Sequence, residues 1–546
     1  MRAGKLIAAA GLFWAFALGW ATLLPGVPSP SSVLHAATGD GDRNDQRGDD
    51  DRNEKRGDDD RSDRRGDDDR GNGHADGRLD AELKSVLKKA QFTGKIESTL
   101  ETRLGRRLNP KLANLGRLLW FDKIHSLGRD NTCAGCHSPT NGFGDTQSIA
   151  IGVQNNNKVG PHRTGPRNQR RSPLVVNTVF LRKLMWNGRF SAPSGDPFDN
   201  SGGFLFPPPE GGVRFPPNDP IVKHLLQAQA HIPPTELVEV AGFTGTCPTL
   251  GPAFCQFDDG KGEPVPEPDD SGFRNEPIRQ SALELLNDSS AYRTLFGQLF
   301  PAVRKGAPID FTMFGLAIAE FEFTLTFADA PIDQFARGRE EAMTASEKRG
   351  ALLFFGEAGC VRCHAVAGES NEMFSDFQDR VIGVPQIAPF FGVELSNMIY
   401  DGPGKDEDFG LQQITGLDSD RYKFRTAPLR NLRVSPAFFH NGAFTKLEDA
   451  IRHHLDVEES ARNYNPLAAG VDHDLTHRLG PIEPVLAKLD KRVRSPIHLS
   501  HSEFRDLVAF VRDGLFDKRA SPKNLCTLVP PSVPSGRRVL EFEACK

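Results

Sequence analysis

The chain has 546 residues, of which 38% are hydrophobic and 25% are charged. At roughly 100–200 residues per domain, this length suggests about two to four domains. The formal net charge is −5, and residues 40–78, with 15 acidic and 10 basic side chains, account for all of it. The rest of the chain is close to neutral, so no basic face points to a nucleic-acid partner.

The N-terminus predicts export. Arg2 and Lys5 precede a nearly unbroken apolar run over residues 6–24, and small residues suited to cleavage follow at 29–37. We interpret residues 1–36 as a signal peptide. Left uncut, the apolar run is long enough to anchor the chain in a membrane. In both cases the body lies outside the cytoplasm, in the periplasm or otherwise exported.

Residues 37–78 contain three copies of Arg-Gly-Asp-Asp-Asp-Arg spaced nine residues apart. This segment has almost no apolar side chains to bury, so it predicts a disordered, solvated linker. A weak calcium site or a surface tether is the alternative.

Helical patterns dominate from residue 79 onward. Leu83 and Leu87 fall on one face of a helix, and so do Leu115 and Leu119. Further helices are expected over residues 281–300, 311–327, 346–355, 447–455 and 502–515. Long loops rich in glycine and proline are expected at 190–215 and 242–273. Strand alternation is scarce, and the predicted fold class is mostly α.

Eight cysteines are present. Four form Cys133-Ala134-Gly135-Cys136-His137 and Cys360-Val361-Arg362-Cys363-His364. The other four are close in sequence as Cys247 with Cys255 and Cys526 with Cys545, which in an oxidising compartment predicts two local disulfides.

Cys-x-x-Cys-His is the attachment motif of a c-type haem. The two thiols form thioethers with the porphyrin, and the adjacent histidine, here His137 or His364, becomes the proximal iron ligand. A thioredoxin-type pair or half a zinc site is the alternative, but a redox pair needs no following histidine. Two copies in an exported helical chain predict two covalent haem c groups.

Short motifs flank these two sites: Trp186-Asn187-Gly188-Arg189 and Gly165-Pro166-Arg167-Asn168 after the first, and Phe439-His440-Asn441-Gly442 after the second. In this order they resemble the bacterial di-haem cytochrome c peroxidase family, which includes MauG. The resemblance covers roughly residues 80–515. It implies two cytochrome c-like haem domains with long irregular loops: a peroxidatic domain at 79–330 and an electron-transfer domain at 331–516, followed by a tail at 517–546.

The resemblance also implies a peroxidatic pocket. Gln229, Pro233 and Glu239 match the family's spacing, and Trp186 matches the tryptophan between the haems. A carboxylic acid in an apolar pocket has a raised pKa and can move the proton that peroxide cleavage requires. A helix surface charge is the alternative for Glu239, with Glu236 as its neighbour, and plain core packing is the alternative for Trp186.

Two further histidines are candidate iron ligands by resemblance. His162 lies in the loop where many members carry a displaceable ligand of the first haem; an exposed loop histidine is the alternative. His454 lies where the family has methionine, or tyrosine in its MauG branch. His453, Met373, Met398 and a surface histidine pair remain open. A bis-histidine iron has a lower potential than a methionine–histidine iron.

Members of the family often hold calcium between the domains, and Asn168 matches the asparagine ligand. The family's Thr-x-Pro pattern, which contributes to the calcium site, is replaced here by Ser435-Pro436-Ala437, so one carbonyl position of that site differs from the family.

The primary hypothesis is an oxidoreductase: a peroxidase that reduces hydrogen peroxide to water with electrons from a small donor protein, either a cytochrome c or a cupredoxin. The alternatives are a MauG-like oxidation of a protein or organic substrate and a di-haem electron carrier without turnover. The sequence leaves a homodimer open, and a membrane partner follows only if the signal is uncleaved.

Overall fold

The computed structural model describes residues 68–206, 212–242, 266–270, 273–389 and 400–545. The export signal, most of the repeat segment, Cys247, Cys255 and Met398 lie outside these residues. No helix among the described ranges is long and apolar enough to cross a bilayer. Residues 66–546 form one unit.

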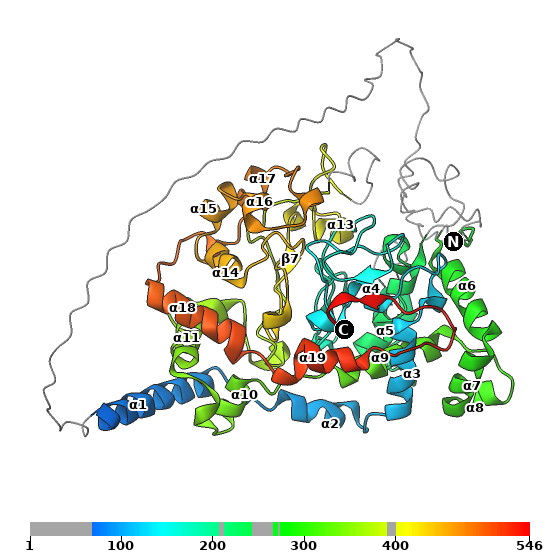
Figure 1. Ribbon diagram of the computed structural model, residues 1–546, viewed down its shortest axis with the longest axis horizontal. Helices are drawn as coiled ribbons and strands as arrows, with labels where there is room; N and C mark the ends of the chain where they lie inside the picture. Colours follow the sequence, from blue (N-terminus) through cyan, green and yellow to red (C-terminus); the bar gives the residue numbers. More distant parts are fainter. Residues whose placement is uncertain (1–67, 207–211, 243–265, 271–272, 390–399, 546) are drawn as a thin grey trace, which may run out of the picture. The chain divides into compact units, whose positions relative to one another are not determined.

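The chain is mostly helical, as predicted (Figure 1). Its first α-helices are α1 (Asp68–Lys89), α2 (Leu100–Leu104), α3 (Pro110–Phe121), α4 (Cys133–Cys136), α5 (Leu225–Gln229), α6 (Asn275–Asp288), α7 (Ser290–Leu299), α8 (Pro301–Arg304) and α9 (Phe311–Thr324). The remaining ones are α10 (Pro331–Ala336), α11 (Ala345–Phe355), α13 (Gln412–Thr415), α14 (Leu447–Leu455), α15 (Val457–Arg462), α16 (Pro466–Ala469), α17 (Glu483–Leu486), α18 (His501–Ala509) and α19 (Pro522–Leu525).

Strands are short and form four two-stranded pairs within the described residues. Antiparallel pairs join β2 (Lys183–Leu184) to β3 (Phe190–Ser191), β4 (Phe204–Phe206) to β5 (Gly212–Phe215), and β6 (Asp379–Arg380) to β7 (Phe424–Arg425). A parallel pair joins β1 (Lys158–Val159) to β8 (Glu541–Phe542). The loop expected at 190–215 therefore contains a hairpin, which buries Phe204 and Phe215.

The helix expected over residues 281–300 is two helices, α6 and α7. Ser289 separates them, and its side-chain oxygen accepts a hydrogen bond from the Tyr292 N–H at 3.4 Å. A serine that caps a new helix offsets the cost of breaking the old one. By contrast, α14 has the predicted bounds, and α18 with the π-turn at Phe510–Gly514 covers the helix expected at 502–515.

The N-terminal helix α1 begins at Asp68, inside the range expected to be a linker. Acidic residues at a helix N-terminus are favoured by the helix dipole, and the apolar face of α1 anchors the helix. Leu83 and Leu87 are buried in a cluster with Phe354 and Phe510, which belong to the half of the chain with the second motif. Figure 1 shows α1 beside α11.

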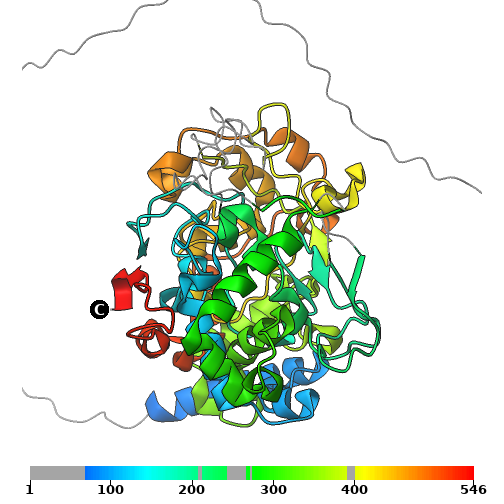
Figure 2. The same ribbon diagram turned by 90° about the vertical axis from the view of Figure 1, so that its right-hand side faces the viewer.

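The C-terminal segment, in turn, packs on the first half of the chain. Residues Leu525, Val533, Leu540 and Phe542 are buried in the cluster that contains Trp120 and Phe143, beside the first motif. In Figure 2 this segment, drawn in red, lies against blue and cyan chain from the first half. Each end of the described chain therefore packs on the half that is remote from it in sequence, across the expected boundaries at 331 and 517.

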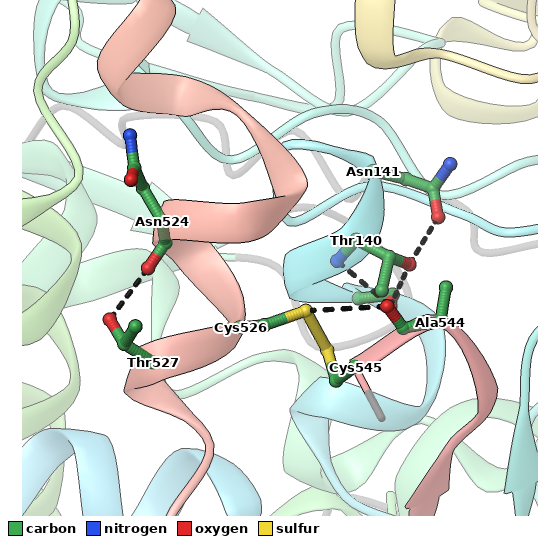
Figure 3. Close-up of a disulfide and its surroundings, with 8 residues drawn as sticks. Thr140, Asn141, Asn524, Cys526, Thr527, Ala544 and Cys545 are labelled. Carbon is green, nitrogen blue, oxygen red and sulfur yellow. Dashed lines mark hydrogen bonds between the residues drawn. A yellow bond between two sulfur atoms is a disulfide. The ribbon is translucent and has the colours of Figure 1, made fainter.

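The predicted disulfide between Cys526 and Cys545 is confirmed. Figure 3 shows it beside Thr140 and Asn141, which belong to the short turn after the first motif. The predicted pair Cys247 and Cys255 lies outside the described residues.

Candidate active site

The first Cys-x-x-Cys-His motif begins α4. The Thr132 hydroxyl donates to the Trp120 carbonyl at 2.8 Å, so the motif is fixed to α3. The Nδ1–H of His137 faces the carbonyls of Phe143 and Pro173 at 3.0 and 3.1 Å. Because carbonyls only accept, the ring carries its hydrogen on Nδ1 and leaves Nε2 free to bind a metal. Burial lowers the pKa of His137, which keeps the ring neutral.

The second motif has the same arrangement. The Nδ1–H of His364 donates to the Phe374 carbonyl at 2.9 Å. On α14, the Nδ1–H of His454 donates to the Ala450 carbonyl at 2.8 Å. The two ring centroids lie 6.2 Å apart. Two imidazoles that share one metal ion, each at about 2.0–2.1 Å and each with its centroid about 1.1 Å behind the nitrogen, are separated by about 6.2–6.4 Å. His364 and His454 therefore fit the two sides of one haem iron.

His453 does not have this geometry. Both ring nitrogens of His453 are engaged, Nδ1 with the Ser460 hydroxyl at 3.0 Å and Nε2 with the Ile382 carbonyl at 2.8 Å. Met373 is fully buried in an apolar cluster that includes Phe180 and Phe377.

One cavity of about 510 Å³ connects the two motifs. His137, His364 and His454 all line it. It is also lined by Arg425, which is 4% exposed and forms no direct ion pair among the described residues; the nearby Asp379 carboxylate is paired with Lys183. Burial lowers the pKa of Arg425 to about 10. A buried guanidinium without a counter-ion is costly, and a haem propionate is an anion that would relieve this cost. The unpartnered indole N–H of Trp120 also lies on the cavity wall. These residues fit haem.

Gln229, Pro233 and Glu239 line the same cavity as the first motif. Gln229 ends α5, and Glu239 lies in a π-turn at Leu237–Ala241. Such turns redirect side chains and are frequent at functional sites. The Asn131 amide pins this turn by donating to the Glu239 carbonyl at 2.6 Å. Gly152 lets the turn approach, since a Cβ there would lie 2.1 Å from the Val238 carbonyl oxygen.

The carboxyl group of Glu239 is electrostatically unusual. Burial, and next the neighbouring charge of Glu236, raise its pKa to about 7. Arg189 and Arg170 act in the opposite direction. Glu236 itself forms an ion pair with Arg189 at 2.6 Å. A group that is half protonated at neutral pH can both accept and donate a proton.

Trp186 joins the two halves of the cavity. Its indole N–H donates to the Arg171 carbonyl at 2.7 Å, and its own carbonyl accepts from the Arg425 N–H at 2.8 Å. Arg171 follows the first motif and Arg425 follows the second, so the tryptophan is fixed from both sides. It also lines the cavity.

Comparison with known proteins shows similarity to one family. Residues 110–341 match the sequence model of the di-haem cytochrome c peroxidase family. This chain is similar to the di-haem cytochrome c peroxidase and MauG proteins. It is similar to the methylamine utilization protein MauG of Methylorubrum extorquens, with 25% identity over 74% of this chain and 78% of that protein. It is also similar to cytochrome c551 peroxidase of Pseudomonas aeruginosa, with 25% identity over 64% of this chain and 72% of that protein.

Among solved structures, a MauG-like protein associated with microbial copper homeostasis aligns with a TM-score of 0.49 and 20% identity, over 78% of this chain and 93% of that one. The diheme peroxidase BthA from Burkholderia thailandensis aligns with the same TM-score and 18% identity, over 80% of this chain and 91% of that one. The family's members are haem oxidoreductases, and the relatives include both peroxidases and MauG proteins.

His162, expected from the resemblance to be a ligand of the first iron, lies at the surface in this structure. The His162 side chain is 76% exposed and does not line the cavity. Its Nδ1–H donates to the Glu543 carboxylate at 3.1 Å. His162 is therefore an exposed loop histidine in this structure, which was the alternative expectation. Its carboxylate partner lies 381 residues away in the sequence, and the local sequence does not reveal it.

Asn168 lies on the cavity wall with its side-chain oxygen buried and unpartnered. The described residues contain no cluster of three or more His, Cys, Asp or Glu side chains that could hold a metal. Ser435 uses its hydroxyl to donate to the Ala437 carbonyl at 2.8 Å, so that carbonyl is already engaged.

One further carboxyl group in the cavity was missed by sequence reasoning. Glu322, on α9, is 5% exposed and leaves Oε2 without a partner. Burial raises its pKa to about 8. It shares a helix face with Phe314 and Ile318, which also line the cavity. Helix α9 is otherwise apolar and contains two acids, Glu320 and Glu322, and this pattern is the signal that could have revealed Glu322.

Proposed function

We propose that this protein is a c-type di-haem peroxidase that reduces hydrogen peroxide to two molecules of water. The reaction consumes two electrons and two protons, and the electrons come singly from a small donor protein, a cytochrome c or a cupredoxin. The observation that carries the proposal is that Glu239, with a pKa of about 7, and Gln229 both line the cavity that the first motif lines.

When bound, the haem at His137 supplies the redox chemistry of peroxide cleavage. The chain's own residues handle the protons and the geometry. Glu239 accepts the proton of the inner peroxide oxygen and returns it to the outer one, which leaves as water. The Gln229 amide orients peroxide by hydrogen bonding, and Pro233 helps exclude water. His364 and His454 would hold the second haem, and Trp186 would conduct electrons from it.

Two other assignments follow from the same proposal. A calcium ion beside the cavity would use the unpartnered Asn168 oxygen, because calcium prefers such ligands. The protein works in the periplasm or another exported location, since both the haem motifs and the Cys526–Cys545 disulfide suit an oxidising compartment.

A MauG-like oxidation of a protein or organic substrate is the second candidate. It is favoured by the facing rings of His364 and His454, because bis-histidine ligation lowers the potential and makes an oxidised iron easier to reach. Turnover of peroxide with a reduced small cytochrome separates the two. Rapid, saturable oxidation of the donor supports the peroxidase. Peroxide consumption that depends on another substrate, without donor oxidation, supports the MauG-like reaction, and no turnover in either assay rejects both.

A further inference from the structure

The C-terminal tail contacts the loop that carries His162. Strand β8 pairs with β1, and the Glu541 N–H donates to the Asn157 carbonyl at 2.9 Å. The Glu543 carboxylate then accepts two hydrogen bonds, both at 3.1 Å, from the backbone N–H and the ring Nδ1–H of His162. The Glu543 side chain is 18% exposed, so the contact is made by a carboxylate that the tail holds in place.

The tail is fixed on both sides of Glu543. The Cys526–Cys545 disulfide follows it by two residues. Phe542 precedes it and is buried against Phe121, with ring centroids 5.5 Å apart. Glu543 is therefore not a freely moving surface side chain.

The other side of the His162 loop is hydrogen-bonded, through Asn131, to the turn that carries Glu239. Arg163, the neighbour of His162, is 3% exposed and donates to the Asn131 side chain at 2.9 Å and to the Gly152 carbonyl at 3.1 Å. Asn131 in turn donates to the Glu239 carbonyl at 2.6 Å. His162 and Arg163 therefore point to opposite sides of the loop. Bringing His162 into the cavity requires that the Glu543 contacts break and that this backbone rearranges.

We propose that Glu543 is a positioning residue for the first haem: it holds His162 at the surface, so that the first iron keeps an open position for peroxide in the fully oxidised protein. The inference rests on the proposed function, because it takes the first haem as the reactive one. Through this contact the tail affects the ligation of the first haem, although the tail is remote from the first motif in sequence.

The test uses the haem-loaded protein and electron paramagnetic resonance of its oxidised form. We expect a high-spin signal from the first iron of the wild type and of His162→Ala. In Glu543→Ala we expect at least half of that signal to become low-spin. The double variant Glu543→Ala with His162→Ala should recover the high-spin signal, because the released ligand is gone. A merely structural role for Glu543 would not be reversed by removing His162.

The matched control is Glu483→Ala. Glu483 forms a surface ion pair with Arg462 at 3.0 Å, away from the tail, and its loss should leave the spectrum unchanged. A second route to the same release is the pair Cys526→Ala and Cys545→Ala, which frees the end of the tail and should raise the low-spin fraction in the same direction.

Two results would overturn the inference. One is a low-spin first iron in the wild type that becomes high-spin in His162→Ala. The other is an unchanged spin state in both Glu543→Ala and the cysteine variant while the wild type turns over peroxide, which leaves the proposed function intact. Failure of the proposed function is distinguishable, because it appears as absent turnover in a wild type whose first iron is open.

Discussion

Glu239→Gln tests the proton-transfer assignment with the least change in shape. Glutamine keeps the size and polarity of the side chain but cannot accept a proton. Positioned acid–base groups contribute about 10²–10⁴-fold to a rate, so we expect peroxide turnover at pH 7 to fall by about that factor. Binding of cyanide or azide to the first iron should change far less, because the cavity remains.

The pH profile adds a second readout. Burial and Glu236 raise the pKa of Glu239 to about 7, and the carboxylate is the form that accepts the proton. Wild-type turnover should therefore fall about fiftyfold between pH 7 and pH 5, since the carboxylate fraction is about one half at pH 7 and about 1% at pH 5. Glu239→Gln should lack this acidic limb.

Glu236→Gln is the matched control, since it changes the neighbouring carboxyl group in the same way. It removes the charge that raises the pKa of Glu239 and leaves Arg189 without its ion-pair partner. Both effects favour the Glu239 carboxylate, so the acidic limb should move to lower pH while turnover at pH 7 stays within a few-fold. If Glu236→Gln abolished turnover and Glu239→Gln did not, the two roles would be reversed and the reasoning refuted. Stopped-flow oxidation of a reduced donor across pH 5–9 measures all three proteins.

Three further predictions concern the second haem, the tail and the cavity. His454→Met should raise the midpoint potential of the second haem, measured by potentiometric titration, by on the order of 0.1 V, which is within the range that axial ligands span. His453→Ala should leave the bis-histidine spectrum in place. The reverse pattern would reject the assignment of His454 as the iron ligand. Replacing both Cys526 and Cys545 by alanine removes a disulfide across 19 residues and should lower the free energy of unfolding by about 3 kcal/mol; an unchanged urea midpoint would contradict this. Burial raises the pKa of Glu322 from its usual 4.5 to about 8, so the folded state holds this proton more tightly than the unfolded state does. Stability should therefore fall as pH rises between those two values. In thermal melts Glu322→Gln should flatten this fall, and the same slope in both proteins would reject the prediction.

The parts of the site that sequence could predict are those coded by spacing along the chain. The two haem motifs, the interval from Gln229 to Glu239 and the bounds of α14 depend on local pattern, and a family resemblance adds roles to them. The Cys526–Cys545 disulfide was predicted on the same basis, because its partners are close in sequence and the compartment is oxidising.

The features that sequence could not predict depend on contacts between distant segments. The Glu543 carboxylate accepts hydrogen bonds from His162, which is 381 residues away in the sequence. No pattern near His162 predicts this contact. The packing of α1 on the second half depends on Leu83 and Leu87 finding Phe354, which the helical pattern permits but does not specify. Glu322 was missed for a different reason: an acid in an apolar helix can be noticed in the sequence, but the cavity that it faces is set by the packing of other elements.

The two haem motifs differ in how much of the iron's surroundings the chain itself supplies. At the second motif, two neutral imidazoles face each other at 6.2 Å, each fixed through Nδ1 to a backbone carbonyl. An iron held there by both imidazoles would have no position left for peroxide. At the first motif, His137 is fixed in the same way, but the opposing histidine expected from the resemblance is held at the surface by Glu543. If the first iron is open as proposed, its open position and the Glu239 side chain face the same cavity, and electrons would pass from the second site to the first. Trp186, bonded to the chain that follows each motif, is the residue best placed to carry them.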